Sequence, residues 1–288
     1  MKTTTMLRKL IEQDGLIVAP GAFSPLGAMM IQKAGFPCVY MSGYGVSAFR
    51  LGYPDVGLMT MTEALDTARS IAAAVDIPVI SDVDTGYGNA INVKRTVEDF
   101  ERAGLAGIQM EDQGWPKRCG HMEGKVLIPA EEMVQKLRMA ADARRDPDFI
   151  LIARTDANTV LGFDEAIRRA NLYAQAGADI VFFESPTTQE QVEQIPRLIQ
   201  APTMINMSEG AKTPLRNNRE IEALGYKLVI WPSSATWAAA KGMQEIYSIL
   251  RHKGTTQEDL DKLILFHDFN DLLGLPQVME LSKAYRAD

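Results

Sequence analysis

The chain is poor in the features that mark secreted, membrane-spanning or disulfide-stapled proteins. Cysteine occurs only twice in 288 residues, at Cys38 and Cys119, which is too few for a disulfide framework at this length. No apolar run approaches the roughly 18 residues that a membrane-spanning helix needs, and residues 1–8 lack the apolar region of a signal peptide. We therefore expect a cytoplasmic protein that does not bind membranes and keeps both thiols reduced.

Positive charge is also scarce. The chain has 30 basic and 37 acidic residues, a net charge of −7, and no block of like charge. Because phosphate backbones are bound by basic surfaces, this balance excludes nucleic acid as the main partner. It does not exclude an anionic small molecule, since a few local lysine and arginine side chains can outweigh the global charge.

Several common catalytic signatures are missing. The sequence has no Gly-Xaa-Ser-Xaa-Gly elbow, no Walker phosphate loop and no glycine-rich dinucleotide fingerprint between a strand and a helix. Histidine occurs three times, and His252 and His267 fall in a C-terminal region where we expect structural or surface roles. The sequence therefore gives no support to serine hydrolase, nucleotide hydrolase or dinucleotide-dependent classes.

What the chain does contain is a regular alternation of short apolar runs with longer amphipathic segments. Several runs are apolar throughout, as expected for strands buried on both faces. The predicted strands are 16–19, 38–41, 79–83, 107–110, 149–153, 179–183, 203–206 and 228–231. The predicted helices are 24–34, 62–74 with Thr62 as N-cap, 96–103, 130–144, 163–176 and 188–199.

Eight strands with intervening helices and no domain break predict an α/β fold, a (β/α)₈ TIM barrel formed by residues 1–288 as a single domain. Ala-Gly pairs before three strands are typical of the helix C-cap and return turn of such repeats. A doubly wound open sheet is the alternative. Residues 235–253 and 257–273 predict two extra helices beyond barrel closure, and we expect the region from about 235 to 288 to serve subunit association.

Acidic side chains follow the predicted strands. Asp82 and Asp84 are two residues apart on one strand and therefore face the same side. Together with Glu111 and Asp55 they predict a site for one hard cation, and Mg²⁺ suits oxygen ligands of this kind. Each acid alone has a plainer interpretation as a turn or cap residue, but several acids on adjacent strand ends repel one another unless a cation is present.

Other polar residues also end strands. Arg154 follows an apolar run and is suited either to a structural ion pair or to a bidentate clamp on a substrate carboxylate. Glu184 and Asn206 end two further strands, and each has a structural interpretation of equal weight when considered alone.

The glycine-rich segment 114–125 predicts a lid over this site. It holds Lys117, Arg118, Cys119 and His121 within five residues, and cationic neighbours make a thiol a candidate acid–base group. Metal binding by Cys119 and His121 is an alternative, although no second Cys–His pair completes a zinc site. A plain solvated loop is the third possibility. Cys38 lies inside an apolar strand and is expected to be a buried core thiol.

The pentapeptide 117–121, Lys-Arg-Cys-Gly-His, resembles the signature of the isocitrate lyase / phosphoenolpyruvate mutase superfamily. The resemblance extends over nearly the whole chain and includes the motifs at 42–44, 54–57, 82–89, 111–113, 153–157, 184–186 and 213–215. Within the superfamily the chain is similar to the short lyases that act on 2-methylisocitrate or 2,3-dimethylmalate, and to carboxyphosphoenolpyruvate phosphonomutase.

The resemblance implies a (β/α)₈ barrel whose last helix is swapped between subunits, usually in a homotetramer. It implies Mg²⁺, with Mn²⁺ as a substitute, held by Asp82, while Asp55, Asp84 and Glu111 act largely through water. It implies that the lid closes over the site with Cys119 as the acid. The residues it places near the substrate carboxylates and the metal-bound oxygens are Ser42, Gly43, Tyr44, Arg154, Glu184 and Asn206.

The reaction implied is cleavage of a carbon–carbon bond in a small 2-hydroxy dicarboxylic acid. Tyr44, Glu184 and a water molecule are the candidate bases for the hydroxyl proton. Arg154, Lys117 and Arg118 supply positive charge for the dianion that forms, and Cys119 returns a proton to carbon. His121 completes the catalytic candidates.

The expected substrate follows from positions at which this sequence differs from other members of the superfamily. Methylisocitrate lyases typically have a second glycine where Tyr44 stands, so Tyr44 and the residues after Asp84 favour an alkyl-substituted malate over a tricarboxylate. A phosphonomutase or an oxaloacetate hydrolase on the same scaffold is the alternative, although Pro232 resembles the lyases more than those hydrolases. A non-catalytic dicarboxylate sensor is disfavoured by the intact lid motif.

Overall fold

The computed structural model describes residues 1–286 of the chain. These residues form two compact units, with the boundary between Thr236 and Trp237 in the sequence. The first unit contains all the strands of the described chain, and the second contains C-terminal helices. Among the described residues, no helix combines the length and the apolar character that crossing a membrane requires.

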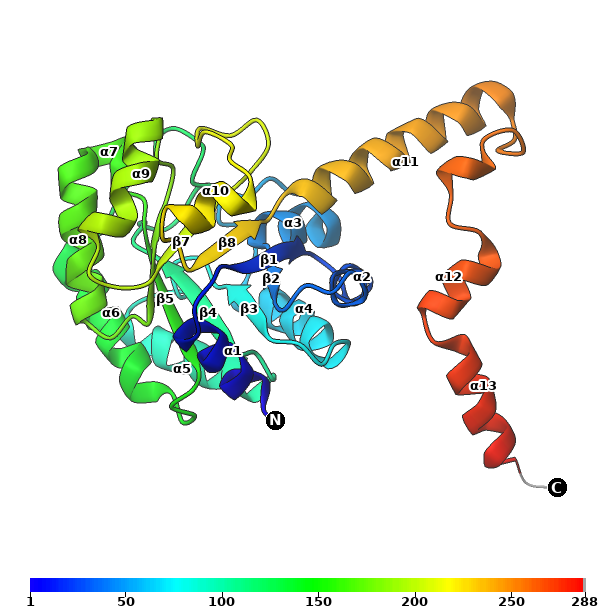
Figure 1. The fold of residues 1–288 in the computed structure, drawn as a ribbon, viewed down its shortest axis with the longest axis horizontal. Helices are drawn as coiled ribbons and strands as arrows, with labels where there is room; N and C mark the ends of the chain where they lie inside the picture. Colours follow the sequence, from blue (N-terminus) through cyan, green and yellow to red (C-terminus); the bar gives the residue numbers. More distant parts are fainter. Residues whose placement is uncertain (287–288) are drawn as a thin grey trace. The chain divides into compact units, whose positions relative to one another are not determined.

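The first unit is a closed barrel of eight parallel strands in the described chain, in the order β1 to β8 (Figure 1). β1 pairs with β8 with Ile17 opposite Leu228, so the sheet has no open edge. The predicted barrel is therefore confirmed, and the open-sheet alternative is wrong. The strands are β1 (Ile17–Ala22), β2 (Val39–Met41), β3 (Val79–Asp82), β4 (Gly107–Glu111), β5 (Ile150–Thr155), β6 (Ile180–Phe183), β7 (Thr203–Asn206) and β8 (Leu228–Trp231).

Helices surround the strands of this unit (Figure 1). Gly35, Gly104 and Gly177 follow α2, α5 and α8 with φ of 86°, 91° and 111°, so the expected left-handed return turns are confirmed. The helices of the unit are α1 (Thr3–Glu12), α2 (Pro25–Lys33), α3 (Gly43–Val46), α4 (Met61–Ala73), α5 (Ala90–Arg102), α6 (Ala130–Ala143), α7 (Asn158–Leu161), α8 (Phe163–Gln175), α9 (Gln189–Leu198) and α10 (Asn218–Ala223).

Two helix starts differ from the prediction. The N-cap of α4 is Thr60 and not Thr62, because the Thr60 hydroxyl accepts from the Glu63 backbone and the Glu63 carboxylate accepts from the Thr60 backbone. α5 starts at Ala90 and not at residue 96, because the Asn89 side chain accepts from two backbone N–H groups of its first turn.

The second unit is built from α11 (Ser234–Lys253), which contains the boundary, the 3₁₀ turn η2 (Leu260–Lys262), α12 (Phe266–Leu272) and α13 (Leu275–Ala284). The single helix predicted for 257–273 is therefore wrong. Asp259 accepts from Lys253 at 2.9 Å, Lys262 lies 3.4 Å from its other oxygen, and the chain becomes extended at Leu263. This pairing closes a tight turn where the apolar spacing alone predicted continuous helix.

Alternate residues of each strand point into the barrel and form one core. Within this core, Ile80, Ile152 and Phe182 are buried, and Leu7 of α1 packs at the same cluster. Successive strand residues alternate between faces, so the next inward-facing positions lie two or four residues further along the chain. At the carboxyl ends of the strands these positions hold polar residues: Ser42, Asp82, Asp84, Glu111, Arg154, Glu184 and Asn206.

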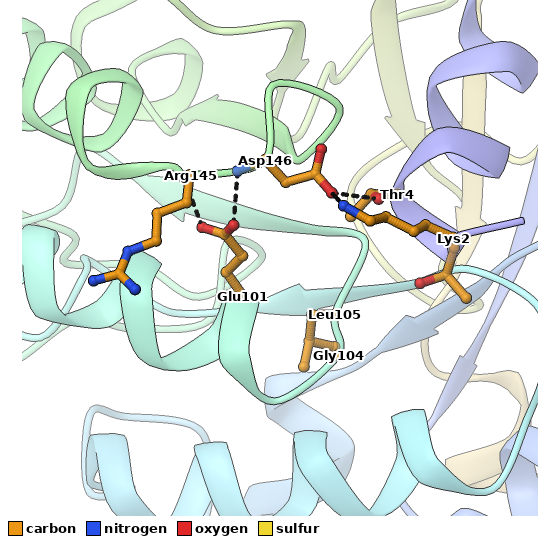
Figure 2. A pocket seen from close by; sticks show the side chains of 8 residues that line it. Lys2, Thr4, Glu101, Gly104, Leu105, Arg145 and Asp146 are labelled. Carbon is orange, nitrogen blue, oxygen red and sulfur yellow. Dashed lines mark hydrogen bonds and ion pairs between the residues drawn. The ribbon is translucent and has the colours of Figure 1, made fainter.

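A hollow of about 440 Å³ lies beside α1 (Figure 2). Its polar groups bind one another: Lys2 and Thr4 donate to the Asp146 carboxylate, and Glu101 accepts from the backbone N–H groups of Arg145 and Asp146. These contacts attach α1 to the loop before β5, which is a structural role.

Candidate active site at the carboxyl ends of the strands

The acidic residues predicted to bind a cation surround one buried ammonium group. Lys117 Nζ lies 2.6 Å from Asp55 Oδ1 and 2.8 Å from Asp84 Oδ1, and the Lys117 side chain is 1% exposed. The Asp84 backbone N–H donates to Asp82 Oδ1 at 3.0 Å. Burial lowers the pKa of Lys117, but the four carboxylates of Asp55, Asp84, Glu111 and Asp82 outweigh it and raise the pKa well above its usual value.

The same carboxylates retain capacity for a divalent cation. Asp84 Oδ2 and Glu111 Oε1 are buried and accept no hydrogen bond. Burial raises the pKa of Asp82 and of Glu111, and raises that of Asp84 to about 7, so a nearby cation would favour their charged forms. Among residues 1–286 no three Asp, Glu, His or Cys side chains are close enough to bind a metal together. The arrangement fits an ion held by few direct ligands and several waters, as Mg²⁺ commonly is.

The backbone at this cluster is held in unusual conformations. Asp84 and Tyr87 have positive φ of 48° and 61°, which non-glycine residues rarely adopt. Gly43 approaches so closely that a Cβ there would lie 2.7 Å from Asp82 Oδ2, so the second position of the predicted Ser42-Gly43-Tyr44 motif requires glycine. The strain is confined to the strand ends that carry the carboxylates.

The motif at 42–44 begins a short helix next to the carboxylates. Ser42 is the N-cap of α3, and its hydroxyl accepts from the Gly45 backbone at 3.3 Å. A π-helix, η1 (Ser47–Leu51), follows directly. Burial, together with the nearby Cys119 and Asp55, raises the pKa of Tyr44. Tyr44 is therefore a neutral phenol beside the lid.

Arg154 is surrounded by carboxylates from neighbouring strands. Its Nη1 lies 3.1 Å from Glu111 Oε2, and its Nε and Nη2 each donate to Asp156 at 3.0 Å. Glu184 Oε2 is 3.7 Å from Arg154 Nε. The guanidinium also stacks 5.4 Å from the centre of the Phe182 ring. Arg154 is therefore held rigidly with its charge directed at the strand ends.

Segment 114–125 is in place over this site. Its base is fixed by an antiparallel bridge between Gln113 and Leu127, and the Cys119 backbone donates to the Asp55 carbonyl at 3.1 Å. Gln113 also exchanges hydrogen bonds of 2.8 and 2.9 Å with the backbone of Arg118. The Arg118 guanidinium turns away: it donates to the Glu123 carbonyl at 3.0 Å and is exposed. The structure thus brings Lys117 and Cys119 to the carboxylates and does not bring Arg118.

The Cys119 thiol is held in its protonated form. Burial is the main cause and Asp55 adds to it, and together they raise the pKa of Cys119 to about 11. Lys117 and Arg154 act in the opposite direction but are outweighed. The closed lid therefore presents an S–H group. Cys38 is buried in the barrel core, and burial raises the pKa of its thiol to about 12.

His121 lies with the other two strand-end candidates. Its Nε2 is 3.6 Å from Glu184 Oε1 and 3.2 Å from Asn206 Nδ2, and its Nδ1 is 3.0 Å from the Ser185 hydroxyl. Burial raises the pKa of Glu184, but the nearby Arg154 and His121 lower it by a larger amount, so the net shift is downward. Glu184 is therefore an ionised carboxylate within reach of the lid.

Three residues of this arrangement were not among the predicted site residues. Asp156 carries the Arg154 contacts, Lys125 bonds Asp156 from the lid, and Ser185 joins Glu184 to His121. Asp156 has a signal in the sequence, since it lies two residues after Arg154 on the same face. Ser185 has a positive φ of 54°, and its only signal in the sequence is its place in the motif at 184–186, which assigns it no role.

Comparison with known proteins places the chain in one family. The model of the family described as phosphoenolpyruvate phosphomutase matches residues 7–251. The chain is 47% identical to a 2,3-dimethylmalate lyase of Eubacterium barkeri, covering 99% of both chains. It is 44% identical to a 2-methylisocitrate lyase of Aeropyrum pernix, covering 93% of this chain and 86% of that protein. A structure of oxaloacetate acetylhydrolase with 3,3-difluorooxalacetate superimposes with a TM-score of 0.93 at 34% identity, covering 98% and 97%.

Proposed function

Because the chain belongs to the phosphoenolpyruvate phosphomutase family, we propose that it is a Mg²⁺-dependent lyase. It cleaves the carbon–carbon bond between C2 and C3 of an alkyl-substituted malate, giving a 2-oxo acid and a carboxylic acid. The observation that carries the proposal is the protonated Cys119 thiol on the closed lid, near the Arg154 and Lys117 charges. A lyase must return a proton to carbon, whereas a mutase that moves a phosphoryl group within one molecule needs no such donor.

The carboxylate cluster is suited to hold the metal. Asp82 would be the direct ligand, and Asp55, Asp84 and Glu111 would accept hydrogen bonds from metal-bound water. When bound, the ion polarises the 2-hydroxyl group and the adjacent carboxylate of the substrate. The unpartnered oxygens of Asp84 and Glu111 support this assignment.

Cleavage begins with removal of the 2-hydroxyl proton. The electron pair of the C2–C3 bond then moves toward C3 as the C2–O bond becomes a carbonyl. Glu184 suits the base better than Tyr44, because its lowered pKa leaves an ionised carboxylate that can accept a proton, whereas the raised pKa of Tyr44 leaves a neutral phenol. A water molecule held by Glu184 would be an equivalent base for the hydroxyl proton.

The charge that develops on C3 spreads into its carboxylate as a dianion. Arg154 and Lys117 supply the fixed positive charge that stabilises it. The Cys119 S–H group then gives its proton to C3, which completes the carboxylic acid product. His121, between Glu184, Asn206 and Ser185, would hold the lid and orient the substrate carboxylate.

Tyr44 supports a small substrate. Its side chain lies close enough to Cys119 and Asp55 that both affect its pKa, so it occupies space next to the reacting atoms. A tricarboxylate would need that space for its third carboxylate. Ser42, Gly43 and Asn206 lie at the same strand ends and would contact the substrate carboxylates.

We further propose that the second unit mediates assembly, in a homotetramer with exchanged C-terminal helices. Among the described residues α12 and α13 bury no side chain, and Val278, Leu281 and Tyr285 are 58%, 60% and 86% exposed. Exposed apolar residues of this density are typical of interfaces.

The test is a substrate panel read by pyruvate release. Cleavage of 2,3-dimethylmalate and of 2-methylisocitrate both yield pyruvate, so one coupled assay compares them. We expect a higher kcat/KM for 2,3-dimethylmalate. A tenfold preference for 2-methylisocitrate, about 1.4 kcal/mol, would reassign the substrate. Oxalate and acetate from oxaloacetate would indicate the hydrolase, and turnover of a phosphonate alone would indicate the mutase.

A further inference from the structure

Lys125 is a buried cation that the proposed reaction does not use. Its side chain is 1% exposed, although it lies at the end of a glycine-rich surface segment. Its Nζ lies 3.2 Å from Asp156 Oδ1 and donates to the carbonyl oxygen of Gly120. Burial of a lysine is unfavourable unless the charge is paired, so these two contacts account for its position.

The Gly120 carbonyl depends mainly on Lys125. The other group near it is the Ser185 hydroxyl at 3.2 Å. That hydroxyl has one hydrogen, and Glu184 Oε1 is a closer, charged acceptor at 2.8 Å. The Lys125 ammonium has three hydrogens, enough for Gly120 and Asp156 together.

Asp156 connects this lysine to the substrate side of the site. Its carboxylate accepts from Nε and Nη2 of Arg154, and its backbone N–H donates to Asp112 Oδ1 at 2.9 Å. Burial raises the pKa of Asp156, but Arg154 and Lys125 outweigh it and the net shift is downward. An ionised Asp156 therefore binds the lid through Lys125 and the guanidinium of Arg154 at the same time.

The lid also fits closely where Lys125 holds it. A Cβ on Gly120 would lie 2.5 Å from Arg154 Nη2 and 2.5 Å from Glu184 Cγ. The Gly120 carbonyl belongs to the peptide that joins Gly120 to His121, and Cys119 is the preceding residue. The contact with Lys125 therefore holds the part of the lid that carries both Cys119 and His121, where it packs against Arg154 and Glu184.

We infer that Lys125 is a positioning residue that locks the lid closed and, through Asp156, couples closure to the orientation of Arg154. The lock follows from the contacts of Gly120, Lys125 and Asp156. The coupling to substrate rests on the proposed function, since it assumes that Arg154 binds a carboxylate of the substrate.

The test compares Lys125→Met with Lys212→Met. Both lysines contact the lid, but the Lys212 partner Glu123 is 82% exposed, so this pair contributes little. The readout is the rate of Cys119 alkylation by iodoacetamide in the enzyme without substrate. We expect Lys125→Met to raise that rate by about tenfold or more at every pH, because a charge-assisted contact holds the lid shut. Lys212→Met should leave it within about twofold of the wild-type rate.

Lys125→Gln is a second variant that keeps the lock testable if Lys125→Met does not fold. It keeps a donor for the Gly120 carbonyl and loses the charge, so the rate should rise in the same direction by a smaller factor. Limited proteolysis of segment 114–125 should follow the same order. Equal alkylation rates in the wild-type enzyme and both folded Lys125 variants would overturn the lock.

Kinetics separate the lock from the proposed function. With 2,3-dimethylmalate, Lys125→Met should raise KM as well as lower kcat, because Arg154 loses its orientation. If KM stays at the wild-type value while alkylation is faster, the coupling to Arg154 is wrong and the lock remains. If even the wild-type enzyme turns over no substrate of the panel, the proposed function fails, while the alkylation result still decides the lock.

Discussion

At the scale of single residues, the site combines an excess of buried negative charge with a small number of fixed cations. Asp55, Asp82, Asp84 and Glu111 share the charges of Lys117 and Arg154. Burial raises the pKa of Glu111 and of Asp84, so the cluster is not fully neutralised by these two cations. The same environment keeps Cys119 protonated, which makes the thiol a proton donor and a poor nucleophile.

Replacing Cys119 by serine tests its role as the acid. Serine keeps the shape of the side chain but is a much weaker acid. A positioned proton transfer is typically worth about 10²–10⁴ in rate, so kcat should fall by that order while the Kd for a substrate analogue changes little. Stopped-flow or steady-state pyruvate release measures kcat, and a competition assay measures the Kd. A variant with near-normal kcat would mean that another group protonates C3.

The pH dependence of alkylation tests the protonation state of the same thiol. Only the thiolate reacts, and its fraction rises tenfold per pH unit below the pKa. Because the pKa of Cys119 is raised to about 11, the logarithm of the alkylation rate should rise with a slope of about one from about pH 7 to 10. Cys119→Ser should remain unlabelled, since Cys38 is buried. A plateau near pH 9 would show an ordinary exposed thiol.

At the scale of elements, the periodic features were predictable and the local irregularities were not. All the strands lie within a few residues of their predicted positions, because runs buried on both faces are visible as continuous apolar sequence. The strand-end site residues follow from those runs, since parallel strands bring their carboxyl ends together. α3 and η1 were not predicted, because four- and five-residue turns carry no periodicity.

Contacts that depend on the path of a loop could not be predicted from the sequence either. Lys125 and Gly120 are five residues apart within the lid, and Asp156 is 31 residues beyond Lys125. Their meeting is decided by the fold of the lid and not by spacing. Arg118, by contrast, was predicted from its charge and its place in the pentapeptide 117–121, and the structure directs it to the Glu123 carbonyl.

The N-terminus of α4 gives a matched pair of substitutions. Thr60→Ala removes the side chain that accepts from Glu63 and should lower the free energy of unfolding by about 1 kcal/mol. Thr62→Ala, inside the exposed first turn, should change it by less than about 0.5 kcal/mol. Urea denaturation followed by circular dichroism measures both. Equal losses, or a larger loss for Thr62→Ala, would contradict the assignment of the cap.

At the scale of the whole molecule, the two ends of the barrel differ in how their polar groups are paired. The polar groups of the hollow beside α1 bind one another, whereas the opposite strand ends contain unpartnered oxygens. A loss of stability and a loss of turnover should therefore be separable by the end of the barrel at which a substitution is made.

Metal removal tests that separation directly. Dialysis against a chelator should abolish turnover, and Mg²⁺ or Mn²⁺ should restore it, while the far-ultraviolet circular dichroism stays unchanged because Lys117 still pairs with Asp55 and Asp84. Asp82→Ala should remain folded and lose metal-dependent turnover. Full activity in a rigorously metal-free sample would contradict the metal assignment.

The position of Lys117 also bears on when a metal ion can exchange relative to opening of the lid. With the lid shut, its ammonium lies between Asp55 and Asp84 and blocks one approach to the carboxylates. An ion held by these carboxylates would therefore exchange while the lid is open, and the opening rate of the lid would limit the exchange rate. Once a dicarboxylate holds the lid shut, a chelator should inactivate the enzyme no faster than the lid reopens, whatever the chelator concentration.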